Sequence, residues 1–106
     1  MVNRFDIYLV NLDPEIVGDA KVARPAIVIS PDEMNAHTAH VVTAPISSST
    51  LAYPTRIPID LLNDRRYVIL DQLRATDKDR LVKKIGSLDN ETQDLIIESL
   101  TEFFAK

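Results

Sequence analysis

The feature that most constrains the fold is a series of short segments rich in β-branched and aromatic residues, followed by one segment with helical periodicity. Proline, aspartate, asparagine and serine bound the short segments, and these residues favour turns. Strands are therefore predicted over 5–12, 24–29, 40–46, 53–60, 66–73 and 80–88. The prolines at positions 54 and 58 place the fourth strand at a sheet edge, because proline cannot donate a ladder hydrogen bond.

Three helical segments are predicted between and after these strands. Ser30 as N-cap, Pro31 and Glu33 indicate a short helix that ends before position 40. Thr76 and Asp79 form a capping-box pattern that allows one helical turn before the last strand. From position 89 an amphipathic helix is expected, with apolar positions Leu95, Ile96, Leu100, Phe103 and Phe104. The predicted fold class is mainly β with α: a small, strongly curved antiparallel sheet or open barrel.

Length and composition indicate a single domain spanning residues 1–106. No apolar run approaches the roughly 20 residues of a membrane span. The first residues carry none of the features of a signal peptide, so a cytoplasmic location is expected. The chain has no cysteine, which excludes disulfides, thiolate zinc sites and a cysteine nucleophile. It also has no glycine-rich phosphate loop.

Charge is distributed unevenly along the chain. The net charge is −4 and the isoelectric point is about 5.0, which by themselves argue against a nucleic-acid-binding protein. Residues 65–84, however, carry seven basic and three acidic side chains, a net of +4. The local potential matters more to a phosphate ligand than the total charge. The alternative is that these charges lie on solvated strand faces and turns.

Two polar signatures lie at strand ends. Arg24 precedes the apolar run of the second strand, and Ser47 and Ser48 follow that of the third. A permanently charged guanidinium beside hydroxyl donors suits the binding and polarisation of a phosphodiester. The alternatives are an ordinary strand-end arginine and a loop serine that satisfies turn backbone. RNA cleavage is the function that this pair suggests.

Five sequence blocks in order resemble the MazF/PemK family of toxin endoribonucleases. They are DIYLVNLDP at 6–14, RPAIVISP at 24–31, APISS at 44–48, DQLRATD at 71–77 and RL at 80–81. The resemblance implies a homodimer of SH3-like, CcdB-like barrels that cleaves single-stranded RNA without a metal or other cofactor. It also implies a cognate antitoxin whose flexible acidic segment occupies the RNA groove. The family's catalytic positions correspond to Arg24 and Ser47.

Further candidates for RNA binding follow from the same blocks and from their neighbours in the chain. Asp71 has a structural alternative, because it could cap a turn or pair with Arg74. His37 and His40 do not make a zinc site by themselves. The candidates are Lys21 in an expected loop over 13–23, Ser48, Tyr53, Arg56, Asp71, Gln72 and Arg74.

The sequence departs from the family pattern at several positions. Most relatives have threonine in place of Ser47, and serine lacks the methyl group that restricts the side-chain rotamer. Relatives usually open the first strand with glycine where this chain has Phe5. The loop before Arg24 is one residue shorter than usual. The PemK branch has an arginine at the position of Ile69, so a MazF-type arrangement is favoured.

A second class of function is a toxin without catalytic activity. The same fold in CcdB inhibits DNA gyrase by protein contact alone. Leu100, Phe103 and Phe104 could form a protein-binding end, although core or dimer contacts also explain them. A gyrase inhibitor has no need of the Arg24 and Ser47 blocks, which therefore discriminate between the two classes.

Overall fold

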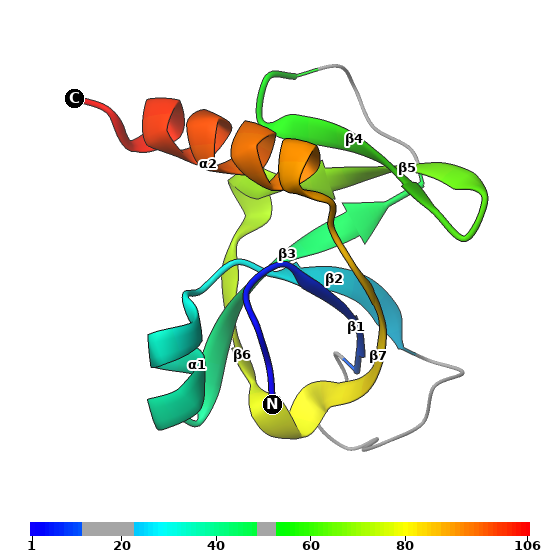
Figure 1. Ribbon diagram of the computed structural model, residues 1–106, viewed down its shortest axis with the longest axis vertical. Coiled ribbons are helices and arrows are strands. Elements are labelled where there is room, and N and C mark those ends of the chain that lie inside the picture. Colours follow the sequence, from blue (N-terminus) through cyan, green and yellow to red (C-terminus); the bar gives the residue numbers. More distant parts are fainter. Residues whose placement is uncertain (12–22, 49–52) are drawn as a thin grey trace.

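The computed structural model describes residues 1–11, 23–48 and 53–106. Most of the expected loop over 13–23, including Lys21, and the link over 49–52 lie outside the described residues. Within the described ranges the protein is mainly β, with a curled antiparallel sheet and two α-helices (Figure 1). This confirms the predicted fold class.

The strands form one sheet in the order β4-β5-β3-β2-β1-β7, and β6 pairs with β3 outside this path. Strand β4 lies at the sheet edge, as its prolines predict. The elements are β1 (Asp6–Val10), β2 (Arg24–Val28), α1 (Asp32–His37), β3 (His40–Ser47), β4 (Arg56–Leu61), β5 (Asp64–Ile69), the 3₁₀ turn η1 (Leu70–Gln72), β6 (Arg74–Asp77), the 3₁₀ turn η2 (Lys78–Arg80), β7 (Leu81–Ser87) and α2 (Asn90–Phe104).

Strand β3 connects the parts of this sheet. On one edge it pairs with β2, with Ala26 opposite Pro45. Its other edge is divided: the first half pairs with β6, and the last two residues pair with β5. Figure 1 shows β3 running from beside α1 to the β4–β5 hairpin. The sheet therefore bends around β3.

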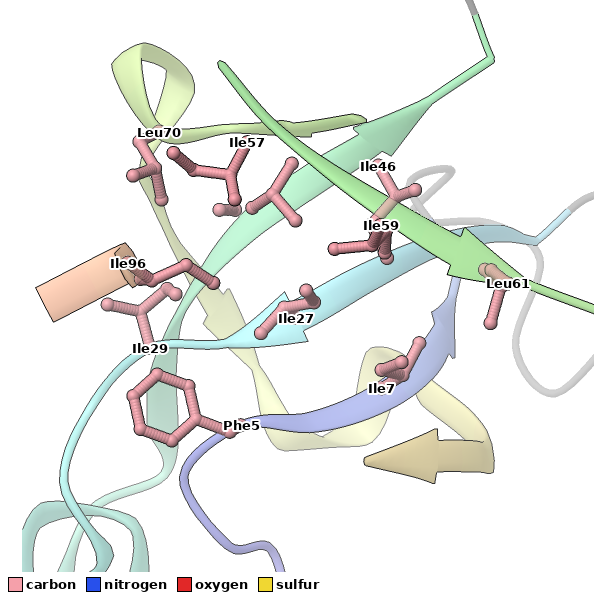
Figure 2. Close-up of a cluster of buried hydrophobic side chains, with 12 residues drawn as sticks. Phe5, Ile7, Ile27, Ile29, Ile46, Ile57, Ile59, Leu61, Leu70 and Ile96 are labelled. Atoms are coloured by element: carbon pink, nitrogen blue, oxygen red, sulfur yellow. The ribbon is translucent and has the colours of Figure 1, made fainter. Parts of the chain in front are cut away.

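Isoleucine side chains dominate the core on the concave side of the sheet (Figure 2). Ile27 is fully buried, and Ile96 of α2 inserts into the same cluster and is also fully buried. Leu100 packs against the cluster, whereas Phe103 and Phe104 remain exposed. The terminal aromatic residues are thus not core residues, because the last turns of α2 extend beyond the sheet (Figure 1).

The predicted cap of the short helix is wrong. Pro31 is the N-cap of α1, without a side-chain cap bond. The Ser30 hydroxyl instead donates to Oδ1 of Asn35 at 2.6 Å and accepts the backbone N–H of Val42 at 2.9 Å. The Ser30 hydroxyl therefore links α1 to β3 by hydrogen bonds, and the bond to Val42 cannot be predicted from the local sequence.

The predicted strand over 66–73 is also too long. Strand β5 ends at Ile69, and residues 70–72 form the 3₁₀ turn η1. Strand β6 was not predicted, so the described residues contain one strand more than expected. The helical turn before β7 is present as η2, but Thr76 does not cap it. Thr76 is buried in β6, with its hydroxyl 2.9 Å from that of Thr43.

Phe5 stands where the family resemblance leads us to expect glycine, and its backbone conformation is one that favours glycine. Its φ is +70°, in the left-handed region that costs a residue with a Cβ roughly 1–2 kcal/mol. Its side chain is 7% exposed and belongs to the core cluster. In this chain the burial of the aromatic ring therefore offsets the backbone strain.

We expect both Phe5→Ala and Phe5→Gly to lower the free energy of unfolding, and we expect the alanine variant to be the less stable of the two. Loss of the buried ring costs about 3–5 kcal/mol, as for other buried phenylalanines. Phe5→Gly should be more stable than Phe5→Ala by about 1 kcal/mol, because only glycine relieves the strain at positive φ. Urea denaturation measures both free energies of unfolding. An alanine variant as stable as the glycine variant would show that this backbone is not strained.

Candidate functional site

Arg24 and Ser47 lie at the same end of two neighbouring strands. The β2–β3 ladder pairs Ala26 with Pro45, and two residues further along, β2 begins at Arg24 and β3 ends at Ser47. Side chains alternate between the faces of a sheet, so the two residues share a face. Their side chains are exposed and half-buried, respectively. The fold thus brings together the two residues that the sequence singled out.

The residues of this face are polar, small or, at Val28, apolar and buried, in contrast with the isoleucine core on the other face. We call it the Thr43 face; on β2 and β3 it comprises Arg24, Ala26, Val28, Thr43, Pro45 and Ser47. Alternation explains the difference, because Ile27, Ala44 and Ile46 point to the core side. Ala26, Val28 and Thr43 are buried on this face as well, and Arg24 and Ser47 at its end reach the surface.

Arg74 joins the same site from strand β6. It pairs with Thr43 across the sheet, and it lines a small cavity together with Arg24. The volume of this cavity is about 30 Å³, close to the volume of one water molecule in the liquid. Apart from the two arginines, this notch is lined by Val10, Pro25, Ala26, Thr43 and Pro45, so its surface is mainly apolar, and it is too small for a nucleotide.

Tyr53, Arg56 and Asp71 form a second group of predicted site residues. The Arg56 guanidinium donates to both carboxylate oxygens of Asp71, with Nε–Oδ1 at 3.4 Å and Nη2–Oδ2 at 3.3 Å. The Thr55 hydroxyl donates to Oδ1 of Asp71 at 3.0 Å. The guanidinium carbon lies 4.9 Å from the centroid of the Tyr53 ring, which is half-exposed. Asp71 thus pairs with Arg56, and the alternative of a pair with Arg74 is wrong.

This arrangement shifts the titration of Asp71. The hydrogen bonds from the Arg56 guanidinium lower the pKa of the Asp71 carboxyl below its usual value, against a smaller opposing effect of burial. Arg56 and Asp71 form an ion pair that fixes both side chains. A cation beside an aromatic ring, as Arg56 is beside Tyr53, is a typical surface for stacking an unpaired base. Tyr53 supplies the aromatic ring of this group, and its side chain is half-exposed.

The remaining predicted site residues lie near these two groups. Ser48 is exposed directly after β3, and Gln72 is exposed at the end of η1, next to Asp71. Lys21 lies outside the described residues. The basic stretch at 65–84 is partly neutralised, because Arg65, Arg66 and Lys84 form ion pairs with Asp60, Asp64 and Asp6.

The structure adds Arg80, which was not among the predicted site residues. Together with Arg74 it lines a cavity of about 390 Å³ that also includes His40 and Asp77. The sequence showed Arg80 only as one member of the basic stretch and of a family block. Its proximity to Arg74 depends on the turn at η2.

The two histidines belong to different elements. His37 ends α1, and His40 begins β3 with its Nε2 atom 2.7 Å from Oδ1 of Asp77. Within residues 1–11, 23–48 and 53–106, no three histidine, aspartate or glutamate side chains are grouped so as to hold a metal ion. In the same ranges no helix has both the length and the hydropathy required to cross a bilayer.

We expect the low pKa of Asp71 to depend on Arg56. An NMR titration should show the Asp71 pKa below its usual value in the wild type and closer to it in Arg56→Gln. Because the folded pKa is depressed, the pair stabilises the fold at neutral pH, and this contribution is lost as pH falls below roughly 4. Arg65→Gln removes an exposed arginine that pairs with Asp60, so it is the matched control and should leave Asp71 unchanged. Equal effects of the two variants would contradict the assignment.

Comparisons with known proteins agree on one family. The family model described as "PemK-like, MazF-like toxin of type II toxin-antitoxin system" matches residues 3–104. Endoribonuclease EndoA of Bacillus subtilis is 32% identical over 94% of this chain and 91% of its own length.

Solved structures show the same fold. Mycobacterium tuberculosis toxin MazF-mt6 superimposes with a TM-score of 0.78 at 22% identity, over 93% of this chain and 95% of its own. An endoribonuclease in complex with its cognate antitoxin, from a mycobacterial species, has a TM-score of 0.80 at 24% identity, with 96% and 93% of the two chains covered. With the family match over nearly its whole length, this chain belongs to the PemK-like, MazF-like toxins of type II toxin–antitoxin systems.

Proposed function

We propose that the protein is an endoribonuclease that cleaves single-stranded RNA as the toxin of a toxin–antitoxin pair, with Arg24 and Ser47 as its catalytic residues. The family match and the similarity to a named endoribonuclease support this activity. The observation that carries the residue assignment is the placement of Arg24 and Ser47 at one strand end of the Thr43 face, with Arg74 beside Arg24.

The reaction defines what these residues have to do. The 2′-oxygen of the ribose forms a bond to phosphorus and loses its proton, while the bond from phosphorus to the 5′-oxygen breaks and that oxygen is protonated. Negative charge accumulates on the non-bridging oxygens during this exchange. Side chains that bind these oxygens more strongly in the transition state accelerate the step.

Arg24 suits the binding of the non-bridging oxygens. Its guanidinium stays protonated at neutral pH and can donate two parallel hydrogen bonds to a phosphate. The Ser47 hydroxyl would donate a further hydrogen bond to the same group. Arg74 borders the same notch as Arg24 and would add positive charge near the bound phosphate.

The alternative of a gyrase-binding toxin is not favoured. The relatives that match this chain are MazF-like toxins and endoribonucleases. Phe103 and Phe104 are exposed, with their rings 4.9 Å apart in an edge-to-face contact, so the end of α2 remains open for a protein contact in a homodimer. A second partner is a cognate antitoxin, whose acidic segment would compete with RNA for Arg24 and Arg74.

Purified wild-type protein should cut a long RNA at discrete sites, also in the presence of EDTA. Arg24→Ala should reduce the cleavage rate by about 10²–10³-fold or more, the usual effect of removing a group that stabilises transition-state charge. Gel analysis of end-labelled RNA measures both. Lys106→Ala, which removes an exposed cation beyond the end of α2, should cleave like the wild type. Intact RNA with a folded wild-type protein would refute the proposed activity.

Two substitutions test the proposed catalytic role of the Ser47 hydroxyl: one removes this hydroxyl and the other keeps it. Ser47→Ala removes the hydroxyl and should lower the cleavage rate about 10-fold to 100-fold, because a hydrogen bond to a charged group is lost. Ser47→Thr keeps the hydroxyl and restricts its rotamer, so it should retain or increase activity. Single-turnover kinetics separate these effects from RNA binding. Equal activity of Ser47→Ala and the wild type would remove Ser47 from the catalytic pair.

A further inference from the structure

Tyr67 of strand β5 stands directly opposite Ser47 in the sheet. The β3–β5 ladder pairs Ser47 with Tyr67 and Ile46 with Val68. Ile46 and Val68 belong to the core cluster, so the side chains of Ser47 and Tyr67 point to the opposite face. The Cβ atoms of two directly opposed residues lie roughly 4.5–5.5 Å apart. An aromatic side chain is therefore the cross-strand neighbour of the Ser47 hydroxyl.

Strand β4 continues this face beyond Tyr67. Pro58 of β4 pairs with Tyr67 and is exposed, and Tyr67 itself is half-buried. Ile57 and Ile59, the neighbours of Pro58 in β4, point to the other side and join the isoleucine core (Figure 2). The Tyr67 ring therefore reaches the surface on the same face as Ser47, and away from the core.

The group of Tyr53 and Arg56 lies further along this face. Arg56 is two residues from Pro58 in β4, about 7 Å along the strand. Its pairing partner in β5 is Ile69, which is buried, so Arg56 and the Tyr53 ring beside it supply the accessible groups at this end. Strand β5 separates them from Ser47. An RNA strand that runs from Ser47 toward Tyr53 therefore crosses β5 next to the Tyr67 ring.

We propose that the Tyr67 ring stacks on the base next to the cleaved phosphate, which makes Tyr67 a substrate-binding residue. Aromatic side chains bind unpaired bases of any sequence in this way, because every base has a π-face. The side chain is attached to a paired strand, so it loses less conformational freedom on binding than a loop residue would. This inference rests on the proposed cleavage of RNA at Arg24 and Ser47.

Binding without cleavage gives the first test. The probe is a fluorescent single-stranded oligodeoxynucleotide of mixed sequence, which lacks the attacking 2′-hydroxyl. Tyr67→Val removes the ring but keeps a strand-forming residue, and it should weaken binding about tenfold, the scale of one lost base–aromatic stack. Tyr67→Phe keeps the ring and is the matched control, so it should bind like the wild type. The slope of log K against log salt concentration should be equal in all three proteins, because the ring contacts no phosphate.

A scan with abasic nucleotides then locates the contact. In RNAs with one abasic ribose each, the abasic position next to the cleaved bond should raise KM about tenfold for the wild type, because the stacked base is missing. The same RNA should show no further rise in KM with Tyr67→Val, whereas abasic positions further away should affect both proteins equally. Tyr67→Leu is the second variant if Tyr67→Val unfolds, and thermal denaturation checks both.

The outcomes separate this inference from the proposed nuclease activity. Ring-dependent binding of the oligonucleotide by a protein that does not cleave RNA would refute the nuclease and support the stacking contact. Cleavage by Tyr67→Val with the affinity and KM of the wild type would overturn the stacking contact alone. Equal losses in Tyr67→Phe and Tyr67→Val would also overturn it, because they would assign the effect to the tyrosine hydroxyl.

Discussion

Strand β3 is the constraint on which the rest of the structure depends. It pairs with β2 along one edge and with β6 and then β5 along the other. Alternation along it sends Ala44 and Ile46 into the isoleucine core and Thr43 and Ser47 to the opposite face. The side chains that stabilise the sheet thereby also fix the position of the candidate site. A shift of the β3 register by one residue would turn Ala44 and Ile46 away from the core and turn Thr43 and Ser47 toward it.

Electrostatics in this protein are local, in spite of a net charge of −4. Ion pairs neutralise Arg65, Arg66 and Lys84, and Asp71 is bound by Arg56. Arg24 and Arg74 line one small cavity, and Arg74 and Arg80 line a larger one. The charge that a ligand would meet is therefore set by contacts between neighbouring strands and not by the net charge of the chain.

The strands were predictable where a segment is apolar and bounded by turn residues, and the long helix where apolar residues recur with helical period. Strand β6 was missed, because Arg74–Asp77 has no apolar alternation of its own and is a strand only through its pairing with β3. Ser30 was misassigned for a related reason: its hydroxyl bonds Val42, twelve positions away, rather than capping α1. Local rules fail wherever a distant partner provides the stronger hydrogen bond.

The sequence by itself determined the fold class, the order of the family blocks, and the positions of Arg24 and Ser47 at strand ends, because hydrophobic period and turn residues are local properties. Only the tertiary structure decided which charges meet. Asp71 pairs with Arg56 across fifteen positions, and Arg74 lines one cavity with Arg24 and another with Arg80. The order of strands in the sheet sets these contacts, and that order results from the packing of the whole core, so no single segment encodes it.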